Sequence, residues 1–455
     1  MSTRGGKKTR IGVIFSAMPP EAPTWPYMGY DYEGRAKELL DKLSKALPDV
    51  ELVGEVVYFV SPYLKQFVRS GSKVHTEEDI WRIVNEEMAD VVGYVIWYLG
   101  LWTPGLVGVV AKTGKPFILV DDLFAGSGEF LSAYSWARKR KLRFLGIASS
   151  NFSDIVEKVK LLCLIDRLRN LKIVVIRRDF PTWFEEYEKT LNEVFGSKIV
   201  RVSVEELIAY YNQASEEEAR KFADKWISNA SLVEAKVEDV VRSARMYIAM
   251  KSLLEKYGAE AITIDCFPPG HKGLPAYPCL GFFQLLNEGY TATCEADLDS
   301  LITQAVIRYL TGKPGFVSDP VIDQGRGWII YAHCLAPTRV YGVGERQVDY
   351  KIRTHSEERA GVAVQAYWPV GEPITTAKIC VMKRMMVIHS GKIASNIEEE
   401  RGCRTKVAAE AEVSNILKNW NYDFGWHRVS VVGDHRKELI DFANLIGLNV
   451  IEEDR

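Results

Sequence analysis

Alternating strand-like and helix-like runs are the feature that most constrains the fold of this chain. Within the first ~170 residues, the apolar runs Ile11–Ser16 and Leu52–Val60 are typical of buried strands. Between them, Tyr32–Leu47 carries apolar residues at helical spacing. Such alternation predicts a mostly parallel sheet covered by helices. We therefore expect an N-terminal α/β domain over residues 1–170.

A second cycle of strand-like and helix-like runs begins at Leu171. It continues through a long helical run, Val237–Tyr257, to a strand that ends at Asp265. We expect it to form a second α/β domain over residues 171–345. The predicted fold class is thus α/β, with two Rossmann-like domains in sequence.

The pattern changes after Val348, where strand-like runs become short and close together. Thr375–Met382, Met385–His389 and Arg428–Val432 are examples. Closely spaced strands favour antiparallel pairing, as in a barrel or a sandwich. We expect residues 346–455 to form a C-terminal antiparallel β-barrel domain.

Charge and cysteine content exclude several classes of function. The 455 residues include 58 basic and 60 acidic side chains, so no field of one sign is expected to attract nucleic acid or a membrane surface. The apolar stretch near Val91–Val110 is interrupted by glycine and proline, which argues against a membrane span. Seven cysteines without a CxxC motif predict free thiols in a reducing cytoplasm, rather than disulfides or a structural zinc site.

Acidic residues end three successive strand-like runs in the second domain. These runs stop at Asp265, Glu295 and Asp319, and a fourth stops at His333. Ligands of open α/β sheets bind outside the carboxyl ends of the strands, so we expect these side chains to meet in one crevice. Crowded carboxylates repel one another unless a proton or a cation neutralises them. Oxygen ligands with an imidazole suit Mn²⁺ or Mg²⁺, and Co²⁺ is an alternative.

Each of these residues also has an ordinary structural interpretation. Asp297 and Asp299 are best explained as N-caps of the helix that follows, whereas Glu295 lies before the cap position. Asp319 precedes a proline and could be a turn residue. His333 could be a hydrogen-bonded histidine of the core.

Two segments carry a more specific combination of residues. The first is Cys294-Glu-Ala-Asp-Leu-Asp-Ser, followed by a helix, Thr311-Gly-Lys-Pro and Phe316-Val-Ser-Asp319. The second is Cys403-Arg-Thr-Lys-Val, followed by Gly425-Trp-His427-Arg-Val-Ser-Val-Val-Gly-Asp434. Together they resemble the metal-site segments of the L-fucose isomerase family, to which the L-arabinose isomerases are related in fold. The resemblance spans most of the chain, although the first domain is similar only in its pattern of elements.

The resemblance implies roles for individual residues. Glu295 and Asp319 would bind the metal and act as acid and base, and His427 would be the third protein ligand. His333 loosely matches a histidine ligand of the arabinose branch. Trp426 stands where L-fucose isomerases have an asparagine that touches the substrate. Further residues expected to position the sugar are Asp265 and His271. The family also implies a homotrimer or homohexamer.

The function that follows is that of a cytoplasmic, metal-dependent aldose–ketose isomerase. Its substrate would be a pentose or a 6-deoxyhexose of the L-fucose or D-arabinose type. A divalent cation, with Mn²⁺ the expected ion, would stabilise the enediolate while two carboxylates move the proton between C1 and C2. The alternatives are a metal-dependent aldolase, another enediolate enzyme on the same scaffold, or a non-catalytic sugar-binding protein.

Overall fold

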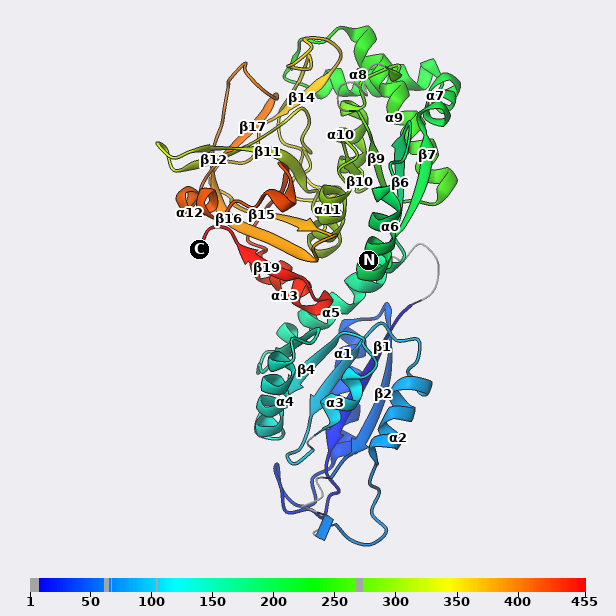
Figure 1. Ribbon diagram of the computed structural model, residues 1–455, viewed down its shortest axis with the longest axis vertical. Coiled ribbons are helices and arrows are strands. Elements are labelled where there is room, and N and C mark those ends of the chain that lie inside the picture. Colours follow the sequence, from blue (N-terminus) through cyan, green and yellow to red (C-terminus); the bar gives the residue numbers. More distant parts are fainter. Residues whose placement is uncertain (1–7, 61–64, 67, 104, 267–272) are drawn as a thin grey trace. The chain divides into compact units, whose positions relative to one another are not determined.

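The computed structural model describes residues 8–60, 65–66, 68–103, 105–266 and 273–455. The chain forms two compact units (Figure 1). Unit 1 comprises Met1–Asp166 and Asp441–Leu448, and unit 2 comprises Arg167–Ile440 and Asn449–Arg455. No helix of the described residues is long and apolar enough to cross a membrane. The expected division into three domains, with boundaries at 170 and 345, stays a prediction.

Unit 1 contains a five-stranded parallel sheet in the order β2-β1-β3-β4-β5. The strands are β1 (Thr9–Ala17), β2 (Val50–Tyr58), β3 (Tyr94–Tyr98), β4 (Phe117–Asp121) and β5 (Phe144–Ile147). The helical segments are α1 (Tyr32–Ala46), α2 (Glu77–Arg82), the π-helical η2 (Ile83–Glu87), α3 (Leu106–Ala111), α4 (Ser127–Lys139) and α5 (Phe152–Arg169), the last continuing into unit 2. Every residue of β3 and β4 is buried, as expected for parallel strands covered on both faces.

Unit 2 begins with a four-stranded parallel sheet in the order β10-β9-β6-β7. The strands are β6 (Lys172–Arg177), β7 (Lys198–Ser203), β9 (Ala261–Ile264) and β10 (Thr291–Thr293). The helices of this part are α6 (Trp183–Phe195), α7 (Val204–Gln213), α8 (Glu216–Asn229), α9 (Val237–Tyr257), α10 (Cys279–Asn287) and α11 (Leu298–Thr311). The helical run predicted at 237–257 is confirmed residue for residue.

The C-terminal part of unit 2 is a closed antiparallel barrel of six strands. Around the barrel the order is β15-β18-β11-β12-β17-β16, and pairing of β15 with β16 closes it. The strands are β11 (Phe316–Asp323), β12 (Trp328–His333), β15 (Pro373–Cys380), β16 (Met385–Asn396), β17 (Thr405–Glu410) and β18 (Arg428–Val432). A seventh strand, β19 (Asn449–Glu452), pairs in parallel with β16. The predicted class, α/β domains followed by an antiparallel barrel, is therefore confirmed.

The other C-terminal elements are small. β13 (Tyr350–Arg353) pairs with β14 (Ala363–Ala366) on one side and with the short β8 (Leu232–Val233) on the other, which gives a separate three-stranded sheet. Helix α12 (Val413–Lys418) and the 3₁₀ turn η4 (Tyr422–Phe424) lie between β17 and β18 in sequence, and α13 (Arg436–Ile446) follows β18. The expected C-terminal strands thus divide between the barrel and this second sheet.

The expectation that a strand of the α/β sheet stops at Asp319 is wrong. β11 continues through Asp319 and Pro320 to Asp323, and both β11 and β12 belong to the barrel. The proline is tolerated because β18 pairs only with residues 316–318 of β11, whereas β12 pairs with residues 319–323. Pro320 therefore lies on a stretch with one neighbouring strand, where a missing backbone donor costs little.

Four polar side chains form a fully buried network within the barrel region. Arg428 pairs with Glu453 at 2.6 Å, and the other carboxylate oxygen lies 2.9 Å from Nδ1 of His389. Nε2 of the same imidazole lies 2.8 Å from the hydroxyl of Tyr331. Because each charged group has an opposite or hydrogen-bonding partner, the network offsets the cost of burying charge.

Candidate active site

Glu295 lies in a tight turn directly after β10. Its φ is 62° and that of Ala296 is 51°, so two successive residues other than glycine are left-handed. Such residues cost of order 1–3 kcal/mol each and persist where surrounding contacts hold them. Here the amide of Glu295 donates to Sγ of Cys266 at 3.4 Å, and the amide of Ala296 donates to the carbonyl of Ile264 at 3.1 Å. The turn is thereby tied to the end of β9.

Asp297 caps α11 and also orients His427. One oxygen accepts from the amide of Ser300 at 2.8 Å, which confirms the predicted N-cap, whereas Asp299 is already inside the helix. The other oxygen, Oδ2, lies 2.8 Å from Nδ1 of His427 and 2.6 Å from Nζ of Lys378. The sequence analysis did not predict this second role of Asp297.

The remaining nitrogen of His427 faces both candidate acids. Nε2 lies 3.7 Å from Oε2 of Glu295 and 3.5 Å from Oδ1 of Asp319. The three residues come from the α/β sheet, from β11 and from the residue before β18. The structure therefore brings together the three residues selected from the sequence. It does so across a sheet and a barrel, and not along the carboxyl ends of one sheet as expected.

His333 lies at the inner side of this group. Its side chain is fully buried, and Nε2 lies 3.7 Å from Oε1 of Glu295. The His333 and His427 rings have centroids 5.3 Å apart. Glu295, His333 and His427 each offer one ligand atom, and these three atoms lie within 4.8 Å of one another. His333 is therefore a possible ligand in addition to Glu295, Asp319 and His427.

The surroundings shift the pKa values of these groups in opposite directions. Burial raises the pKa of Glu295, with His333 and His427 partly offsetting it and Asp319 adding to it. Burial alone would raise the pKa of Asp297, but Lys378 and His427 hold it well below its usual range. Asp297 is thus held as a carboxylate, whereas Glu295 binds a proton more readily than an exposed glutamate does.

Next to these groups lies a buried thiol, Cys334. Hydrogen bonds from the thiols of Cys279 and Cys294 lower the pKa of Cys334. Burial lowers the pKa of His333, but the adjacent Cys334 and Glu295 outweigh it and raise that pKa to about 10. Sγ of Cys334 lies 3.2 Å from Nδ1 of His333, so this ring is held on one side by sulfur and on the other by a carboxylate.

Glu295, Asp319, His333 and Cys334 belong to the lining of a cavity of about 610 Å³. Pockets of this size are typical for small-molecule ligands. Glu295, Asp319 and His333 lie on its wall, and Trp420 and Trp426 provide an aromatic side. Trp426 is 70% exposed, so its ring is available to contact a ligand. The described residues of the lining include no lysine or arginine.

The other predicted site residues fall elsewhere. Asp265 forms an ion pair with Arg177 at 2.9 Å and is not part of the described cavity lining. His271 lies outside the described residues. Lys378 was missed, although a lysine within the apolar run of β15 was a visible signal for a buried, paired charge.

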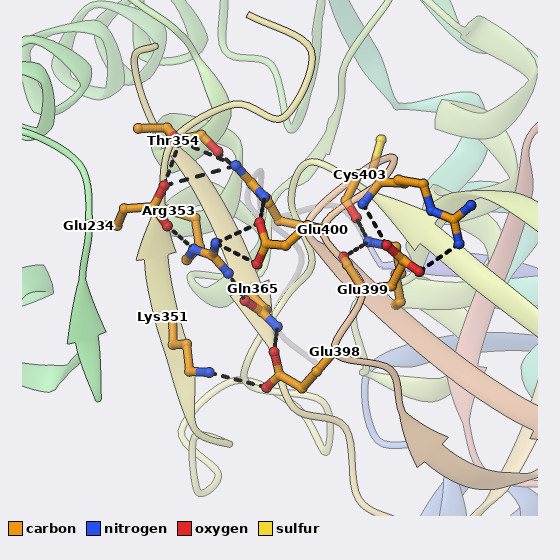
Figure 2. Close-up of polar contacts among 12 residues, drawn as sticks. Glu234, Lys351, Arg353, Thr354, Gln365, Glu398, Glu399, Glu400 and Cys403 are labelled. Carbon is orange, nitrogen blue, oxygen red and sulfur yellow. Dashed lines mark hydrogen bonds and ion pairs between the residues drawn. The ribbon is translucent and has the colours of Figure 1, made fainter. Parts of the chain in front are cut away.

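A polar network holds the loop between β16 and β17. Figure 2 shows Glu398 and Glu400 of this loop joined to Lys351 and Arg353 of β13, with N···O distances of 3.1 Å for both pairs. Cys403 follows in the same loop and lines the cavity. The network therefore fixes the loop that carries Cys403.

Comparisons with known proteins point to sugar isomerases. The family model of the L-arabinose isomerase central domain matches residues 186–312. Sulfoquinovose isomerase of Priestia megaterium is 22% identical over 314 residues, which are 65% of this chain and 67% of the relative. Sulfoquinovose isomerase of Clostridium sp. is 22% identical over 272 residues, or 57% and 59% of the two chains. These matches support an aldose–ketose isomerase enzyme of the L-arabinose and L-fucose type. Assignment to the L-fucose isomerase family itself stays a prediction.

Proposed function

We propose that this chain is a metal-dependent aldose–ketose isomerase acting on a pentose or a 6-deoxyhexose, with Glu295, Asp319 and His427 at its active site. The observation that carries the proposal is the position of His427, whose Nε2 lies within 3.7 Å of both acids. The isomerase relatives add independent support.

The donor set suits a hard divalent cation, with Mn²⁺ as the proposed ion. Two carboxylates and an imidazole are ligands that Mn²⁺ and Mg²⁺ accept. Burial, with a smaller contribution from Asp319, raises the pKa of Glu295, and a cation beside it would stabilise its carboxylate. Asp297 holds Nδ1 of His427, which leaves Nε2 as the ligand atom. When bound, the cation would polarise the sugar oxygens and stabilise the negative charge that develops on them.

Glu295 and Asp319 are proposed to move the proton between C1 and C2. Isomerisation requires a group that first accepts and then returns the carbon-bound proton, and a raised pKa makes the Glu295 carboxylate a stronger base for that step. The left-handed turn at Glu295 fixes the direction of this side chain.

The cavity lining favours an uncharged sugar. Its described residues carry carboxylates, imidazoles, thiols and tryptophans but no lysine or arginine, the side chains that most often bind a sulfonate. This supports a pentose or 6-deoxyhexose over sulfoquinovose. Sulfoquinovose is a second candidate because the curated relatives bear its name.

A substrate panel tests the proposal. The Mn²⁺-loaded protein would be incubated with L-fucose, D-arabinose, L-arabinose and sulfoquinovose, and the products separated by chromatography. We expect the matching ketose from one of the first three sugars. Shortened fragments would indicate the aldolase alternative, and turnover of sulfoquinovose alone would reverse the assignment of substrate class.

The assembly and location are also proposals. A homotrimer or homohexamer in the cytoplasm fits the similarity to L-arabinose and L-fucose isomerases. Light scattering of the purified protein measures the assembly, and a mass equal to three or six chains is expected.

A further inference from the structure

A cluster of buried thiols and imidazoles lies in the same cavity as the oxygen-rich site. Cys279 is the first residue of α10, Cys334 directly follows β12, and His355 lies two residues after β13. All three side chains are buried and line the cavity. One ligand atom from each lies within 4.8 Å of the other two. Elements far apart in sequence therefore bring two sulfurs and one nitrogen to one point.

The distance between the two sulfurs matches the distance between two thiolates that bind one ion. Sγ of Cys279 and Sγ of Cys334 lie 3.9 Å apart. Two sulfurs that each lie about 2.3 Å from a tetrahedral Zn²⁺ are separated by roughly 3.8 Å. A disulfide would require about 2.05 Å.

The third ligand is held in place by its neighbours. Oε2 of Glu357 lies 2.9 Å from Nδ1 of His355, within ion-pair distance. Nε of Arg404 donates to the carbonyl of Thr354 at 2.9 Å, and the same guanidinium pairs with Glu400 at 2.8 Å. Figure 2 shows Thr354 and Glu400, the two residues that this guanidinium joins. The segment that carries His355 is therefore preorganised.

We propose that Cys279, Cys334 and His355 form a second cation site, which takes Zn²⁺ or a similarly thiophilic divalent ion. Thiolate and imidazole ligands select such ions, whereas the neighbouring oxygen-rich group selects Mn²⁺ or Mg²⁺. Both sulfurs would bind the ion as thiolates, so the Cys279 thiol would release its proton to solvent on binding. The proposal does not depend on the isomerase activity.

A second triplet shares one of these ligands. Cys294, His333 and Cys334 also offer ligand atoms within 4.8 Å of one another. An ion bound by this second triplet would compete with Glu295 for His333, whose Nε2 lies 3.7 Å from the Glu295 carboxylate. Cys279 and His355 belong to the first triplet alone, so substitution of either one tests that site separately.

Cobalt spectroscopy of the full-length protein tests the site. The reduced, metal-free protein would be titrated with Co²⁺, whose bonds to thiolate absorb strongly in the near ultraviolet. We expect this absorption in the wild type and in Glu295→Gln, and its loss in Cys279→Ser. Cys380→Ser is the matched control, because Cys380 is buried but lies in a different apolar cluster. Absence of the absorption in the wild type, or its persistence in Cys279→Ser, would overturn the proposal.

X-ray absorption of the wild type covers the case in which Cys279→Ser does not fold. The protein would be loaded with one equivalent of Zn²⁺ in the presence of excess Mn²⁺. We expect two sulfur neighbours at about 2.3 Å together with nitrogen or oxygen at about 2.0–2.1 Å. A first shell of nitrogen and oxygen alone would rule the site out.

Discussion

Asp297 Oδ2 lies 2.8 Å from Nδ1 of His427, a contact that joins the start of α11 to the residue before β18. The same carboxylate caps the helix and pairs with the buried Lys378. One side chain thus couples the α/β sheet to the barrel and fixes which imidazole nitrogen faces Glu295 and Asp319.

This contact predicts that Asp297→Asn weakens binding of Mn²⁺. Loss of a carboxylate that orients a ligand histidine typically lowers metal affinity 10–100-fold. Titration calorimetry with Mn²⁺ measures the change. The matched control is Asp299→Asn, because Asp299 lies in the same helical turn but accepts from Tyr187 and the amide of Val381. Equal loss of affinity in both variants would show that helix stability, and not His427, is responsible.

Trp426 is predicted to contribute to substrate binding. Its exposed ring lines the cavity, so Trp426→Ala removes apolar surface that a sugar ring would cover. We expect KM to rise about tenfold, equivalent to ~1.4 kcal/mol, with kcat little changed. Tyr422→Ala is the control, since Tyr422 is also exposed but is not part of the described lining. A fall in kcat with unchanged KM would contradict a binding role.

The buried network around Glu453 is predicted to stabilise unit 2. Glu453→Gln leaves Arg428 without its anionic partner, which should cost about 3–5 kcal/mol. Thermal unfolding should show a clear loss of stability. Glu452→Gln, one residue earlier and more exposed, should change it much less.

The same network predicts an effect of pH. Burial raises the pKa of Glu453, but His389 and Arg428 outweigh it, so the folded-state pKa lies below the ordinary value of 4.5. A lowered pKa stabilises the fold above that value, and the contribution is lost as pH falls through the lowered range. Melting temperature should therefore decrease on acidification below about pH 4.5, and less steeply in Glu453→Gln. If melting temperature fell equally steeply with pH in the wild type and in Glu453→Gln, Glu453 would be excluded as the cause of the acid sensitivity.

Local signals in the sequence were sufficient for many of the elements. The run at 237–257 forms one helix because its apolar spacing continues without interruption until Gly258, which is left-handed. The cap at Asp297 and the strands of the barrel after residue 373 likewise follow from local pattern. The resemblance selected Glu295, Asp319 and His427, which do converge.

Other features depend on contacts between distant segments. Nothing local distinguishes β11 as a barrel strand, because its pairing with β18 joins residues more than 100 positions apart. The thiol cluster escaped notice for the same reason: Cys279 and Cys334 are separated by 55 positions, so a search for closely spaced cysteines could not find them. Asp297 was explained by its cap alone, since its second partner is 130 positions away.

Exchange of the carbon-bound proton tests the central claim most directly. The Mn²⁺-loaded protein would be incubated with each candidate sugar in deuterated water, and deuterium at C2 followed by NMR. We predict incorporation by the wild type and by Asp265→Asn, whose carboxylate pairs with Arg177 away from the described cavity lining. Glu295→Gln should be slower by about 10²–10⁴-fold while remaining folded. Exchange with none of the sugars, or an unchanged rate in Glu295→Gln, would contradict the account.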